Sequence, residues 1–60
     1  MKNITRLIGS DDNQIGDDLD GFLPVFKGMK LGINNLPYVV ADFEIVLRSS
    51  EVVLYIRFEN

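Results

Sequence analysis

The chain has 60 residues and a formal net charge of −3, and it contains neither cysteine nor histidine. This length allows one small domain, and the missing residues exclude disulfides, thiolate metal sites and the usual catalytic base. Domains of this size usually need a staple, so association with another chain is expected. The sequence pI is near 4.5, so the chain is negatively charged at neutral pH and repels phosphate. This disfavours nucleic-acid binding by simple charge attraction. No apolar run approaches the roughly 18 residues of a membrane span, and the expected location is cytoplasmic.

The N-terminal third carries all of the net charge. Residues 11–20 contain no basic side chain, whereas acidic and basic side chains balance over residues 21–60. The acidic residues of this segment are Asp11, Asp12, Asp17, Asp18 and Asp20. Because clustered like charges repel one another, we predict an acidic arm at residues 1–20 that is flexible or partly helical. Within it, residues 4–8 suit either one helical turn ending at Gly9 or a short edge strand.

The acidic segment has two further interpretations. Counting from Asp11, an EF-hand calcium loop is matched at Asn13 and Gly16, but Ile15 fails and the twelfth position is Phe22. We therefore expect no metal and no cofactor. The segment is then either an ordinary solvated loop or a docking arm that steers the chain toward a protein partner with a basic surface.

Period-two alternation of β-branched and aromatic residues predicts strands at residues 29–33, 38–47 and 52–58. Residues 22–26 are a possible fourth strand, interrupted by Pro24. A three-residue loop at residues 34–36 would place Leu31 opposite Val39. We therefore expect an all-β domain at residues 21–60, built as a meander of antiparallel strands.

A two-residue turn at Ser49 and Ser50 sets the register of the last hairpin. It places Ile45 opposite Leu54 and keeps the apolar residues together, whereas a slip of one residue would oppose apolar and polar side chains. The predicted core face consists of Ala41, Phe43, Ile45, Leu47, Val52, Leu54, Ile56 and Phe58. On the opposite face Asp42 meets Arg57.

That opposite face is not fully polar, since it also carries Tyr38, Val40, Val46, Val53 and Tyr55. One interpretation is that the N-terminal third or a curled sheet covers it. The other is that it forms a surface for a partner protein or for self-association, because exposed apolar patches usually mark interfaces.

Catalysis finds little support in the sequence. Without histidine or cysteine, a nucleophile and its base would have to come from serine, threonine, lysine, tyrosine and carboxylates. The pair Ser49 and Ser50 suits a tight turn, and Asp42 is explained by its cross-strand neighbour Arg57. We therefore predict a protein that is not an enzyme.

Two stretches resemble the N-terminal domain of elongation factor P. They are the FKGMKLGI motif of residues 26–33 and the PYVVADFE motif of residues 37–44, and the closing LYIRFEN of residues 54–60 is similar to the third strand of that family. The resemblance covers roughly residues 26–60 and implies a small, partly open SH3-like (KOW-type) barrel. The family's basic, glycine-rich hairpin tip, which reaches tRNA on the ribosome, is replaced here by residues 48–51, RSSE. The family's two further domains have no counterpart in this chain.

These observations predict a small protein-binding module, such as an adaptor, inhibitor or assembly subunit of the kind familiar among phage and mobile-element products. It would bind through the apolar face and the acidic arm. The alternative, which the resemblance implies, is a factor associated with RNA or the ribosome. The residues that would serve this second function are Lys27, Lys30, Arg48 and Arg57.

Overall fold

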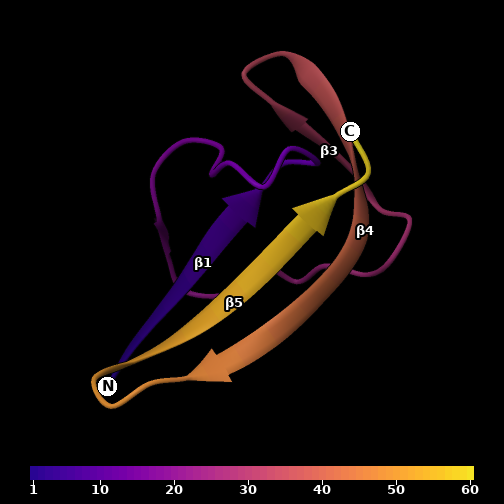
Figure 1. The fold of residues 1–60 in the computed structure, drawn as a ribbon. Coiled ribbons are helices and arrows are strands. Elements are labelled where there is room, and N and C mark those ends of the chain that lie inside the picture. Colours follow the sequence, from indigo (N-terminus) through magenta and orange to yellow (C-terminus); the bar gives the residue numbers. More distant parts are fainter.

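The computed structural model describes residues 1–60 and shows a chain made of strands and loops (Figure 1). The strands are β1 (Lys2–Ile8), β2 (Leu19–Asp20), β3 (Lys30–Ile33), β4 (Leu36–Leu47) and β5 (Glu51–Phe58). They form one sheet in the order β2-β1-β5-β4-β3, which does not close into a barrel. The predicted all-β class is confirmed. The structure contains no helix, and hence no helical segment that could span a membrane.

The N-terminal residues belong to the sheet. Strand β1 pairs in parallel with β5, from Lys2 opposite Glu51 to Ile8 opposite Arg57, and antiparallel with β2 on its other side. Residues 4–8 are therefore an interior strand, and the prediction of a partly helical arm was wrong. The sheet is mixed rather than an antiparallel meander, and residues 1–20 do not form a unit separate from it. The physical reason is burial, because Ile4 and Leu7 are both buried in β1.

The hairpin of β4 and β5 has the predicted register through most of its length. Phe43 lies opposite Ile56, Ile45 opposite Leu54, and Asp42 opposite Arg57. The turn between the strands lies at residues 48–50, where the Arg48 amide donates to the Glu51 carbonyl at 2.9 Å. Toward its start β4 departs from this register. Val40, rather than Ala41, lies opposite Phe58, because a β-bulge at Ala41 adds one residue to β4.

The hairpin of β3 and β4 has a two-residue turn, so the predicted three-residue loop was wrong. Asn34 and Asn35 both have positive φ, 51° and 66°, as a type I′ turn requires, and this turn matches the twist of the flanking strands. Leu31 consequently lies opposite Tyr38, and Lys30 opposite Val39. The bulge at Ala41 compensates for this register by returning the start of β4 to the core face.

Residues 21–29, which we call the crossing segment, connect β2 at one edge of the sheet with β3 at the other. They therefore cross a face of the sheet. The buried Thr5 hydroxyl holds the beginning of this segment, since it donates to the Gly21 carbonyl at 2.6 Å and accepts from the Leu23 amide at 3.2 Å. The core beneath comprises Leu7, Val40, Leu54, Ile56 and Phe58, with Leu23, Val25, Met29, Leu31 and Tyr38 packed against it.

Candidate functional site

An apolar cleft of about 500 Å³ lies between the crossing segment and β4. Its lining residues are Phe22, Leu23, Pro24 and Val25 from the crossing segment, Phe43, Glu44 and Ile45 from β4, and Leu54 from β5. The crossing segment covers only part of the core face, so the part of that face near the β4–β5 turn remains open. The cleft is the boundary between the covered and open parts.

The open part of the core face exposes large apolar side chains. Phe43, Ile45 and Leu47 alternate along β4 and are 38 %, 58 % and 77 % exposed, in order of approach to the turn. Phe22 lies on the opposite wall of the cleft and is also exposed. Together Phe22, Phe43, Ile45 and Leu47 form what we call the open apolar face. Contiguous exposed apolar surface of this kind usually marks an interaction site.

The open apolar face borders an unpaired strand edge. Strand β3 pairs with β4 only from Leu36 to Val39, and the last backbone bonds on that side join Val40 to Gly28 and Met29. Beyond Val40, the edge of β4 has no neighbouring strand. Because the Arg48 amide bonds to Glu51, alternation directs the backbone groups of Phe43, Ile45 and Leu47 away from β5 and toward this open edge.

The five apolar residues predicted to form a partner surface do not share one face. Val40 is 1 % and Val53 0 % exposed, and Tyr38, Val46 and Tyr55 are half-buried. The bulge at Ala41 places Tyr38 and Val40 on the core face, whereas Val46, Val53 and Tyr55 remain on the opposite face. Buried Val40 and Val53 are structural residues and are not available to a partner.

The exposed part of β4 was assigned to the core by sequence reasoning. One signal in the sequence did indicate the opposite, because the strand at residues 38–47 is about twice as long as the strand predicted at residues 29–33. A short neighbour cannot pair along all of a long strand. Part of its edge must then lie open, whereas the covering of the apolar face beside that edge depends on the path of the rest of the chain.

Four of the five aspartates lie in the loop between β1 and β2, and the fifth, Asp20, lies in β2. Asp18 forms a two-pronged ion pair with Arg6, at 2.8 Å to Nε and 2.7 Å to Nη2, and it also accepts from Gln14. The hydrogen bond and charge of Arg6 lower the pKa of Asp18, and the hydrogen bond and charge of Asp18 in turn raise the pKa of Arg6. The pKa of Asp11 is lowered mainly by the backbone amide of Asn13. No three acidic groups of the chain come together as a metal site would require.

On the face opposite the crossing segment, two arginines converge on one phenol. Arg6 Nη1 and Arg48 Nη2 donate to the Tyr55 hydroxyl at 3.1 and 2.8 Å. The Arg6 guanidinium also lies over the Tyr55 ring, 5.4 Å from its centroid. Through Asp18, Arg6 and Tyr55, this cluster joins the loop before β2 to β1 and β5 and holds the N-terminal part of the chain on the sheet.

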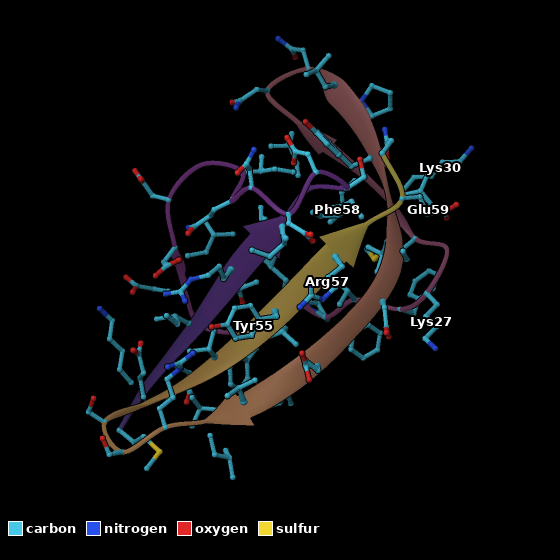
Figure 2. All side chains as sticks on the ribbon, viewed as in Figure 1. Lys27, Lys30, Tyr55, Arg57, Phe58 and Glu59 are labelled. Atoms are coloured by element: carbon cyan, nitrogen blue, oxygen red, sulfur yellow. The ribbon has the colours of Figure 1, made fainter.

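The four basic residues of the alternative function do not converge. Figure 2 shows Lys27 and Lys30 on the β3 side of the sheet, away from Arg57 on β5. Lys27 lies 3.8 Å from Asp42, and Arg57 lies 3.7 Å from Asp12 and 4.0 Å from Glu44. Arg48 lies at the turn after β4. Two of the four cations are thus paired with carboxylates, and no continuous basic surface connects them.

Comparison with known proteins gives no relative for this chain, since no protein-family model, curated protein or solved structure matches it. The resemblance to elongation factor P stays a prediction from the sequence motifs.

Proposed function

We propose that this chain is a small, non-enzymatic protein-binding module that binds its partner through the apolar cleft and the open apolar face. The observation that carries the proposal is the position of the cleft, which lies beside three exposed apolar residues of β4. A partner that inserts an apolar side chain into the cleft would bury its lining and the neighbouring residues together. Burial of that apolar surface supplies the driving force for association.

The chemistry of the cleft supports binding rather than catalysis. Glu44 is its one ionisable lining residue, and no hydroxyl or amine side chain lines it. Such a lining offers shape and apolar surface to a ligand but no nucleophile with an adjacent base. The cleft opens onto an exposed apolar strand face, which favours a protein surface over a small molecule as the ligand.

The acidic residues keep a secondary role in this proposal. Asp12, Asp17 and Asp20 are exposed, and Asp17 and Asp20 take part in no ion pair of the structure, so their charge is available to a basic partner. Charge of this kind mainly accelerates encounter and selects the partner, while the apolar contact holds the complex. Asp18 contributes less, because Arg6 already neutralises it.

The experiment compares two phenylalanines of the crossing segment. Phe22 lines the cleft, whereas Phe26 is more exposed, at 62 %, and lies outside it. Tagged wild-type protein, Phe22→Ser and Phe26→Ser would be used to capture partners from a nuclease-treated lysate of the producing cells. We expect one specific protein to be retained by the wild type and Phe26→Ser and lost with Phe22→Ser. Equal capture by both variants would contradict a role for the cleft.

The same experiment distinguishes the ribosome-associated alternative. Binding to RNA phosphates would be removed by nuclease, would weaken steeply with salt, and would be lost in a Lys27→Ala/Lys30→Ala variant. Binding through the cleft would survive all three treatments.

A further inference from the structure

Strand β4 has an edge without the usual protection against pairing. Exposed edges are normally made short, interrupted by proline or a bulge, or marked with charged side chains, most often lysine. The outer strand β2 has only two residues, and the outer strand β3 begins with Lys30. Between Asp42 and Leu47, by contrast, β4 has no proline, no lysine and no bulge, and its two charged residues, Asp42 and Glu44, lie on the face opposite the exposed apolar side chains. The bulge at Ala41 lies just before this stretch.

The edge also offers a regular set of backbone groups. Phe43, Ile45 and Leu47 direct their amides and carbonyls toward it, as the bonding of Arg48 to Glu51 establishes. Of these, the Phe43 amide is taken by the Asp42 carboxylate at 2.8 Å. The amides of Ile45 and Leu47 have no partner strand. An added strand would satisfy them.

The sequence around Ile45 is complementary to itself when reversed. Two residues away on either side are Phe43 and Leu47, both apolar and exposed. Three residues away are Asp42 and Arg48, which carry opposite charges. We propose that a second copy of this chain pairs antiparallel with β4 along this edge, with Ile45 on the two-fold axis.

Three of the four kinds of pair in this arrangement are favourable, and the fourth places Glu44 opposite Val46 without opposing two like charges. Ile45 meets Ile45 of the second copy, and Phe43 meets Leu47, on the open apolar face. On the opposite face Asp42 meets Arg48 twice, once on each side of the axis. Cross-strand apolar and opposite-charge pairs stabilise antiparallel sheets. In this arrangement the two Ile45 residues exchange backbone hydrogen bonds, and the Leu47 amide of each copy donates to the Phe43 carbonyl of the other. A partner without this pattern would lack the two charge pairs, which is why a second copy fits best.

The dimer extends the proposed function and rests on it, because the edge that pairs and the cleft that binds the partner protein both belong to β4. A two-fold axis perpendicular to the sheet keeps the core faces of both copies on one side. Phe43 and Ile45 line the cleft as well as the edge, so the two clefts would lie next to each other across the axis. A partner protein would then meet one continuous apolar surface with a cleft in each half.

The proposed pairs of Asp42 with Arg48 can be tested by reversing one charge at a time. The oligomeric state of each variant would be measured by sedimentation equilibrium over a concentration series. Asp42→Arg opposes two guanidinium groups on each side of the axis, and Arg48→Asp opposes two carboxylates. We expect each variant to weaken dimerisation about tenfold or more relative to wild type. An equimolar mixture of the two variants restores both opposite-charge pairs, so it should return to dimer. A variant that had failed to fold could not form a dimer on mixing. Recovery of the dimer in the mixture therefore reports the restored charge pairs.

A disulfide test fixes the register. The chain has no cysteine, so single substitutions give an unambiguous result. Ile45→Cys places the two thiols on the axis, within the Cα separation of about 4.4–6.8 Å that a disulfide spans. Leu47→Cys is the matched control, because position 47 is more exposed than position 45 but lies opposite position 43. We expect mild oxidation to link Ile45→Cys into a dimer at least tenfold faster than Leu47→Cys.

A wild-type chain that stays at its monomer mass of 6.8 kDa at millimolar concentration would overturn the proposal. So would a charge-variant mixture that remains monomeric, or faster linkage of Leu47→Cys than of Ile45→Cys. None of these results would affect the capture experiment with Phe22→Ser, which tests the cleft in either oligomeric state. Loss of the dimer with retained capture would leave the protein-binding function standing on a monomer.

Discussion

Val40 lies opposite Phe58, while Asp42 lies opposite Arg57. Between these two pairs β4 advances by two residues and β5 by only one. The extra residue is Ala41. The bulge changes which side chains of β4 face the core. After the bulge these are the odd-numbered residues Phe43 and Ile45, and before it they are the even-numbered residues Tyr38 and Val40. The bulge is therefore what reconciles the two hairpins of the sheet.

Deletion of Ala41 is predicted to leave the fold intact. The deletion joins Val40 directly to Asp42, so β4 alternates without a bulge and Val40 stays opposite Phe58 on the core face. We therefore expect the free energy of unfolding to change by less than about 1 kcal/mol, as for the substitution Ala41→Ser. Urea denaturation followed by circular dichroism would measure both variants. A loss on deletion of about 1.5–3 kcal/mol or more, the contribution of one buried large apolar side chain, would contradict this position of the bulge.

The turn between β3 and β4 should respond to residue type at position 35. Asn35 has φ of 66°, a conformation that costs a β-branched residue about 1–2 kcal/mol and costs glycine almost nothing. Asn35→Gly should therefore preserve or raise the free energy of unfolding, and Asn35→Val should lower it by about 1–2 kcal/mol. If the two variants had equal unfolding midpoints in urea, the type I′ turn would not be formed in solution.

Thr5 is predicted to hold the crossing segment in place. Its hydroxyl bonds to Gly21 and Leu23 and is buried, so Thr5→Val would leave a carbonyl and an amide without partners at nearly constant volume. Such loss costs about 1–3 kcal/mol. Thr5→Ser retains the hydroxyl and is the matched control. Hydrogen exchange should show faster exchange at the Leu23 amide in Thr5→Val, and unchanged exchange there would contradict the assignment.

The ion pair of Arg6 and Asp18 predicts a modest dependence of stability on pH. Arg6 lowers the pKa of Asp18 below its ordinary value of 3.8, so the pair contributes at neutral pH and its contribution is lost as pH falls below about 4. Arg6 stays charged throughout, because its own pKa is raised. As both side chains are partly solvated, Asp18→Asn should cost about 0.2–1 kcal/mol at pH 7. The difference from wild type should shrink toward pH 2 in urea denaturation, and a difference that grew on acidification would exclude this account.

The hairpin of β4 and β5 was predictable because its information is local. Alternation from Phe43 to Leu47 and from Val52 to Phe58 sets the faces, and the turn after Arg48 sets the register. The all-β class follows from the same alternation. Neither result depends on what lies across the face of the sheet.

The position of β1 and the open apolar face could not be read from the sequence. β1 pairs in parallel with β5, about fifty residues away in the chain, and no local pattern specifies a partner at that distance. Phe43 and Ile45 have the same alternation as buried Ile56, and they are exposed because the crossing segment passes over one end of the core face and leaves the other open. Alternation determines which face a side chain occupies. Whether that face is covered depends on the path of the rest of the chain.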